Sequence, residues 1–196
     1  MLRKDYTFIK KIKIMISKWI LKLMGWKIVG EYYKVDKCII VVAPHTSMMD
    51  FVVGRLFFNT LPIKVHFVIK KEMFFFPLGY LLKALGAIPV DRGTRNNMVD
   101  QLADLFNSKD KMFLIITPEG TRKKVLRWKR GFYFIAEKAN VPIYTGILDY
   151  KKKEIFVGEQ FIPTGDIEVD MKAIRLRYKG ATGKHPEYFS IGNAEE

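Results

Sequence analysis

Short apolar runs alternate with amphipathic stretches along most of this 196-residue chain, and no other feature constrains its fold as strongly. Strand-like runs occur at residues 38–43, 63–70, 87–90, 111–117 and 142–150, and residues 153–161 also alternate like a strand. Between and after them, helical spacing occurs at residues 48–59, 74–85, 96–108, 131–140 and 166–180. Strands that alternate with helices predict an α/β domain.

The N-terminal segment has the apolar stripe of an amphipathic helix. Its apolar residues recur at spacings of three and four: Phe8, Ile9, Ile12, Met15, Ile16, Trp19, Ile20, Leu23 and Met24. Lysines fill much of the other face, a pattern that suits a helix lying in a bilayer interface. The alternative is a helix that packs on the domain and exposes its lysines. We favour the interface and expect residues 1–30 to form an amphipathic membrane-associating helix and residues 31–196 the main domain.

Positive charge is concentrated in two segments. The formal net charge is +14, and residues 1–30 together with residues 122–130 account for nearly all of it. A basic surface attracts phosphates, whether in nucleic acid, in an anionic bilayer or on a small substrate. Because no nucleic-acid-binding module accompanies the charge, we expect a membrane surface or a phosphorylated small molecule and no nucleic acid.

Two further features limit the possible functions. The single cysteine, Cys38, excludes an internal disulfide framework and lies in an apolar run, which indicates a buried and unreactive thiol. The most apolar long window, residues 73–90, contains two prolines and two glycines, which disfavour a membrane-spanning helix. We expect a buried helix or an acyl-contacting surface there.

The stretch "APHTSMMD" at residues 43–50 follows the first buried strand and carries a candidate general base. On one regular helix His45 and Asp50 would lie about 140° apart around the axis and could not meet. They can meet if the helix begins between them, with Thr46 or Ser47 as its N-cap. Asp50 would then orient the imidazole and raise the basicity of its other nitrogen. By spacing alone this is weak evidence, because many histidines are only polar surface.

Two later stretches follow strands and could bind an anion. In "TPEGTR", residues 117–122, Gly120 lets backbone amides approach an anion, Thr121 can donate a hydrogen bond and Arg122 can grip a phosphate in bidentate fashion. In "VDRGTR", residues 90–95, Arg92 and Arg95 could supply further phosphate contacts. An ordinary surface turn is the alternative for each stretch.

The chain resembles the glycerolipid acyltransferase family, whose best-known members acylate lysophosphatidic acid. The resemblance rests on four blocks in the family's order: "HTSMMD", "GAIPVDR", "TPEGTR" and "VPIYTG", within residues 45–146. It implies a mixed central β-sheet flanked by helices, membrane association, and acyl transfer from a thioester to a hydroxyl without a metal or an acyl-enzyme. Residues 31–196 would then be an acyltransferase domain.

The resemblance also implies roles for particular residues. His45 would deprotonate the acceptor hydroxyl while Asp50 holds the imidazole. The acceptor phosphate would be bound by Arg92 and Arg122, in a site that also includes Glu119, Gly120 and Thr121. The expected partners are a lysophospholipid such as 1-acyl-glycerol-3-phosphate, and acyl-CoA or acyl-carrier protein as donor, with no other cofactor. The expected location is the cytoplasmic face of the cell membrane, in peripheral or monotopic attachment.

Three alternatives remain open at this point. The acceptor could be a different amphiphile. The protein could be a non-catalytic binder of anionic surfaces that uses its two basic segments. A hydrolase could use the same histidine to activate water.

Overall fold

The fold is built on a mixed β-sheet, which has seven strands within the described residues. The computed structural model describes residues 2–30, 35–91 and 95–192. The strand order is β1-β7-β6-β2-β5-β3-β4. The strands are β1 (Lys27–Gly30), β2 (Lys37–Ala43), β3 (Val65–Lys70), β4 (Ala87–Val90), β5 (Met112–Ile116), β6 (Ile143–Asp149) and β7 (Glu154–Phe161). Neighbours are parallel except β6 and β7, which pair in antiparallel fashion, so the predicted mixed sheet is confirmed.

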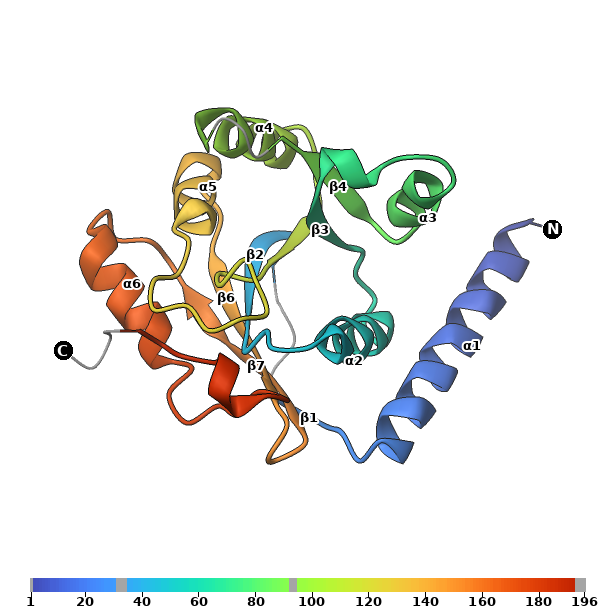
Figure 1. The fold of residues 1–196 in the computed structure, drawn as a ribbon. Helices are drawn as coiled ribbons and strands as arrows, with labels where there is room; N and C mark the ends of the chain where they lie inside the picture. The colour runs from blue at the N-terminus through green and yellow to red at the C-terminus, as the bar shows by residue number, and fades with distance from the viewer. Residues whose placement is uncertain (1, 31–34, 92–94, 193–196) are drawn as a thin grey trace.

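Helices cover the sheet on both faces (Figure 1). They are α1 (Leu2–Leu23), α2 (Met48–Asn59), α3 (Leu78–Ala84), α4 (Arg95–Asn107), α5 (Gly131–Ala139) and α6 (Ile167–Leu176), with short 3-10 turns η1 (Lys71–Met73) and η2 (Pro186–Tyr188). Each predicted helix exists, but the one expected at residues 74–85 is shorter and follows η1. The strand β1 was not predicted.

The two faces of the sheet carry separate apolar cores, as the period of two along β2 requires. Ile39 and Val41 pack with residues of α4, α5 and α6 on one face. Cys38 and Ile40 pack with residues of α2 and with the end of α1 on the other. The Cys38 side chain is fully buried and burial raises the pKa of its thiol, in agreement with the unreactive role predicted from the sequence.

The N-terminal helix α1 contacts the domain with a face that leaves much of its apolar stripe exposed. Ser17 and Leu21 are buried, and α1 packs against α2. Phe8, Met15 and Trp19 are more than 60% exposed and point away from the domain. No helix in the described part of the chain has the length and apolar character needed to cross a membrane.

Candidate active site

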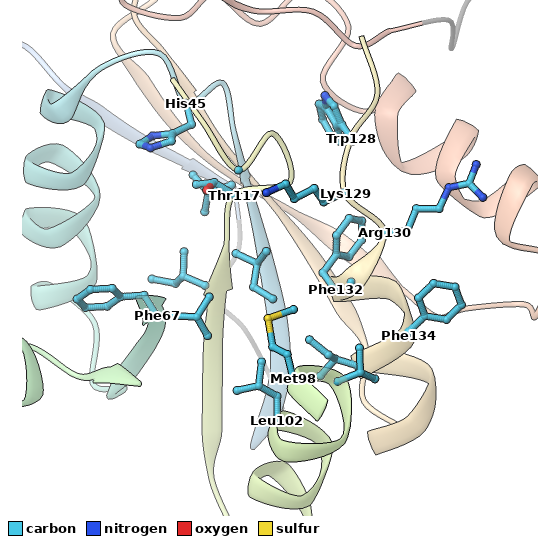
Figure 2. A pocket seen from close by; sticks show the side chains of 18 of the residues that line it. His45, Phe67, Met98, Leu102, Thr117, Trp128, Lys129, Arg130, Phe132 and Phe134 are labelled. Atoms are coloured by element: carbon cyan, nitrogen blue, oxygen red, sulfur yellow. The ribbon is translucent and has the colours of Figure 1, made fainter. Parts of the chain in front are cut away.

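The candidate site lies where β2 and β5 end. These strands are parallel neighbours, so their carboxyl ends meet at one edge of the sheet. His45 follows β2 and Thr117 follows β5, and both line one large cavity of about 1730 Å³ (Figure 2). The topology thus brings together two motifs that are about 70 residues apart in the chain.

Helix α2 begins between His45 and Asp50, as the spacing required. Ser47 is the N-cap, and its hydroxyl accepts the Met49 N–H at 3.2 Å. Asp50 completes a capping box, because its Oδ2 accepts the Ser47 N–H at 2.8 Å. The same oxygen lies 3.2 Å from His45 Nδ1 and accepts the Thr46 N–H at 2.7 Å. A histidine and a carboxylate are therefore held in contact by the start of the helix.

The other oxygen of Asp50 is held by a residue that the sequence analysis missed. The Tyr150 O–H donates to Asp50 Oδ1 at 2.7 Å from the end of β6. The Tyr150 ring packs edge-on against Trp26, with 4.9 Å between ring centroids, and the Lys153 ammonium lies 5.9 Å from the Tyr150 ring centroid. No local pattern could reveal this contact, because 100 residues separate the tyrosine from the aspartate.

Asp50 is ionised at neutral pH despite its burial. Burial alone would raise the pKa of this carboxyl, but the hydrogen bonds from His45, Ser47, Tyr150 and Thr46 outweigh it and hold the pKa below its usual range. An ionised Asp50 accepts the Nδ1–H of His45 and so favours the tautomer in which Nε2 is free of a proton. The His45 side chain is 23% exposed, which gives it access to the cavity.

Glu119 supports the loop that carries His45. Its Oε1 accepts the His45 backbone N–H at 3.0 Å, and its Oε2 is buried with no hydrogen-bond partner among the described residues. Burial raises the pKa of this carboxyl to about 7. Glu119 is not part of the described lining of the cavity. Its contact with the His45 backbone therefore stabilises the loop and does not face the cavity.

The C-terminal segment holds the same loop from a third side. The His185 backbone N–H donates to the buried Thr46 Oγ1 at 3.2 Å. At Gly183 there is no room for a side chain, because a Cβ built there would lie 2.7 Å from Thr46 Oγ1 and 3.1 Å from Pro44 Cβ. The loop is thus fixed by strand ends and by a segment about 140 residues away.

The cavity combines an apolar wall with a basic rim. Its apolar wall is formed by α2, β3, β5, α4 and α5: Phe51, Phe58, Val65, Phe67, Val68, Met98, Val99, Leu102, Ile115, Ile116, Phe132 and Ile135. Its basic side chains include Arg127, Lys129 and Arg130 from the segment before α5. Arg130 is paired with Glu168, whereas Lys129 has no ion-pair partner among the described residues.

Lys129 lies over Gly120, at the turn after β5. The Lys129 N–H donates to the Pro118 carbonyl at 2.8 Å, and its side chain extends across the cavity toward Thr117 (Figure 2). A Cβ built on Gly120 would lie 2.6 Å from the Lys129 ammonium nitrogen, so the glycine leaves the room that this lysine occupies. The basic segment was recognised in the sequence, but Lys129 was not singled out within it.

The structure does not bring all of the predicted anion-binding residues into the cavity. Gly120 lines the cavity, with a backbone φ of 65°. Thr121 and Arg122 are exposed and are not part of the described lining, and the Thr121 hydroxyl accepts the Lys123 N–H at 3.3 Å. Arg92 lies outside the described residues. Within the described ranges no group of three or more His, Cys, Asp or Glu side chains is placed to hold a metal ion.

The motifs, the fold and the His45–Asp50 contact agree with the comparison by family model, which matches residues 26–148 to the family described as Acyltransferase. The chain belongs to the acyltransferase family. The match includes all four motif blocks, so the resemblance to glycerolipid acyltransferases is confirmed and the protein is an acyltransferase.

One solved structure gives the acyltransferase fold a second line of support. The crystal structure of the 1-acyl-sn-glycerophosphate (LPA) acyltransferase PlsC from Thermotoga maritima matches with a TM-score of 0.58 and 20% sequence identity. The match covers 94% of this chain and 85% of that chain, and at this identity it shows the fold. No curated protein matches this chain in sequence.

Proposed function

We propose that this acyltransferase transfers a fatty acyl group from an acyl thioester, acyl-CoA or acyl-carrier protein, to the hydroxyl of a lysophospholipid, with 1-acyl-glycerol-3-phosphate as its acceptor. The observation that carries the proposal is the contact between His45 and Asp50 beside a cavity that has an apolar wall and a basic rim. Three further hydrogen bonds hold the Asp50 carboxylate in place. A phosphorylated amphiphile with an acyl chain has the matching chemistry. The name of the similar structure supports the choice of acceptor.

The proposed reaction is direct transfer with His45 as general base. Nε2 takes the proton of the acceptor hydroxyl while the oxygen attacks the thioester carbonyl carbon. The carbon–sulfur bond then breaks, and the departing thiolate receives the proton from the imidazolium. Because a thioester is already activated, an oriented base and a site that holds both substrates suffice for the reaction.

For the acceptor phosphate we propose Lys129 together with Arg122 and Arg92, with Gly120 and Thr121 shaping the turn beside it. Lys129 is favoured by its place in the cavity lining and by its lack of an ion-pair partner among the described residues. A lysine ammonium binds phosphate as a compact charge, without the fixed geometry of an arginine. The family resemblance implied that Glu119 belongs to the phosphate site, but its bond to the His45 backbone N–H suits it better to positioning the His45 loop.

We also propose that the enzyme works at the cytoplasmic face of the cell membrane, attached through α1. The exposed side chains Phe8, Met15 and Trp19 form an apolar face that the domain leaves uncovered. Lysines such as Lys11, Lys18 and Lys22 flank this face and suit an anionic leaflet.

The test is release of free thiol from acyl-CoA or acyl-carrier protein in the presence of 1-acyl-glycerol-3-phosphate, with the product identified by lipid mass spectrometry. His45→Gln should abolish turnover, because glutamine fills the site without acting as a base. The matched control is His66→Gln, on β3, which retains a group able to bond the Gly86 carbonyl and should keep the wild-type rate.

Three outcomes would reject the proposal. Full activity of His45→Gln would exclude histidine as the base. Free fatty acid without acylated acceptor would indicate a hydrolase. Salt-sensitive binding to anionic vesicles without turnover of any thioester would indicate a non-catalytic surface binder.

A further inference from the structure

A cluster of exposed apolar side chains lies on η1, on the loop after it and on α3. Within residues 73–81, five large apolar residues face solvent: Met73 (44% exposed), Phe75 (58%), Phe76 (82%), Tyr80 (73%) and Leu81 (57%). The Phe76 and Tyr80 rings are in contact, with 6.2 Å between centroids. Single exposed apolar residues are ordinary, whereas a contiguous aromatic group of this kind marks an interaction surface.

The charges around the cluster favour a lipid surface over a protein. Lys70, Lys71 and Lys83 are exposed and border the apolar residues, and Glu72 is the only acid in residues 70–85. Protein interfaces are depleted of lysine, so a protein partner would be unusual for this composition. Aromatic side chains bordered by lysines are the composition of segments that lie at the headgroup level of an anionic bilayer.

The cluster is also structurally linked to α1. Helix α1 packs against α2, and Arg55 of α2 donates to the Leu85 carbonyl at the end of α3 at 3.0 Å. Burial and the positive charge of Arg55 lower the pKa of the Lys13 side chain on α1. Figure 1 shows α1, α2 and α3 on one side of the molecule and α6 on the other.

We propose that residues 70–83 form a second bilayer-binding surface, which inserts Phe75, Phe76, Tyr80 and Leu81 into the interface of an anionic membrane. Together with α1 it holds the domain at two points, which limits its rotation on the membrane. This proposal rests on the proposed function only in taking the bound surface to be a cell membrane. Its test measures vesicle binding and requires no turnover.

Membrane contacts through α1 and residues 70–83 would turn the α2 side of the cavity toward the bilayer. Phe51 of α2 and Phe67 of β3 line the cavity, and their rings lie 5.4 Å apart. Phe51 is 39% exposed, and α2 contacts both proposed membrane-binding elements, because it packs against α1 and its Arg55 is hydrogen-bonded to the end of α3. An acyl chain that leaves the bilayer beside α2 would therefore meet the apolar wall of the cavity before it meets bulk water.

The experiment compares two double variants of the full-length protein on vesicles of phosphatidylglycerol and phosphatidylcholine. Phe76→Ser with Tyr80→Ser should weaken vesicle binding by roughly tenfold or more, because both side chains would otherwise bury apolar area in the interface. The matched control is Ile162→Ser with Val169→Ser, which removes two residues that are 66% and 60% exposed, the first directly after β7 and the second on α6. It should change binding by less than about twofold, as expected for side chains outside the membrane contact.

Two further measurements make the outcome unambiguous. Tyr80→Trp in a Trp19→Phe background adds one exposed tryptophan to the buried Trp26 and Trp128, so bromine-labelled lipids should quench its fluorescence more than that of the Trp19→Phe parent. The difference reports insertion at residue 80. Lys70→Glu with Lys71→Glu should reduce binding to anionic vesicles and leave binding to pure phosphatidylcholine unchanged.

The proposal fails if the Phe76 and Tyr80 variant binds vesicles as well as wild type, or if Tyr80→Trp is quenched no more than its Trp19→Phe parent. It also fails if that variant changes the oligomeric state in sedimentation while vesicle binding is preserved, because the cluster would then be a contact between copies of the chain. If no thioester is turned over but the vesicle results hold, the proposed function fails and the membrane surface stands.

Discussion

Removal of the Tyr150 hydroxyl isolates the contribution of one hydrogen bond to the His45–Asp50 pair. Tyr150→Phe deletes the donor that lies 2.7 Å from Asp50 Oδ1 and keeps the ring that packs against Trp26. A hydrogen bond to a charged group contributes about 1.5–3 kcal/mol. Asp50 retains its bonds to His45, Thr46 and Ser47, so we expect the lower end of that range.

In kinetic terms about 1.4 kcal/mol is a factor of ten, so Tyr150→Phe should lower kcat/KM roughly tenfold. Most of the loss should appear in kcat, because Tyr150 does not line the cavity. The pKa of Asp50 should rise toward its usual value, because a bond that favours its ionised form is lost. Since the stability contributed by Asp50 is lost as pH falls through its folded-state pKa, acid unfolding of the variant should begin at higher pH.

The matched control is Tyr133→Phe. Tyr133 is buried on α5, and its O–H donates to Asp170 Oδ2 at 2.9 Å, in a tyrosine–aspartate pair that is not part of the described cavity lining. It should lower the free energy of unfolding, measured by denaturant titration, and leave kcat/KM unchanged. The positioning role of Tyr150 is refuted if both variants lose stability alike while kcat/KM of Tyr150→Phe equals that of wild type.

Three further predictions concern the loop and the basic rim. Burial raises the pKa of Glu119 from 4.5 to about 7, so the wild-type protein loses stability as pH rises between these values. Glu119→Gln places a neutral side chain there and should stabilise the protein above pH 7 by up to about 3 kcal/mol. Denaturant titrations of both proteins at pH 4 and pH 8 measure the difference in unfolding free energy. Gly183→Ala should cost about 1–3 kcal/mol of unfolding free energy, because its Cβ would meet Thr46; an unchanged melting temperature would contradict the packing argument. Lys129→Met should raise KM for a phosphorylated acceptor roughly tenfold and leave KM for a neutral monoacylglycerol acceptor unchanged. Arg122→Met should have the smaller effect, because Arg122 is not part of the described cavity lining.

The local part of the site was predictable from sequence because it depends on helix geometry. The spacing of His45 and Asp50 admits contact only when the helix starts between them, and the structure has Ser47 at that start. The turn at Gly120 was predictable for a similar reason, since it directly follows a buried strand. Both inferences used backbone rules that act over a few residues.

The residues that were missed reach the site through the tertiary fold. Tyr150, Lys129 and Gly183 contact the loop or the cavity from segments that no short pattern connects to His45. The strand β1 was missed because it has four residues, all exposed, and therefore shows no apolar period. Its pairing with β7 is a long-range interaction that local propensity does not determine.

The same long-range packing decides how membrane attachment through α1 is best tested. From the sequence, we expect deletion of residues 1–28 to weaken vesicle binding more than it disturbs folding. That outcome requires a segment that does not pack against the rest of the domain. The structure buries Leu21 and Trp26 in a core and pairs β1 with β7, so this deletion also removes packing that supports Tyr150. It would confuse loss of folding with loss of binding.

Substitution of the outward face of α1 avoids that confusion. Phe8→Ser, Met15→Ser and Trp19→Ser together remove three side chains that are more than 60% exposed, so the free energy of unfolding should change by less than about 0.5 kcal/mol per site. Vesicle partitioning should fall by tenfold or more, because each side chain otherwise buries apolar area in the interface. If partitioning is unchanged while the protein remains folded, α1 is a packed helix with a solvated face, and the interfacial interpretation of the N-terminal stripe is wrong.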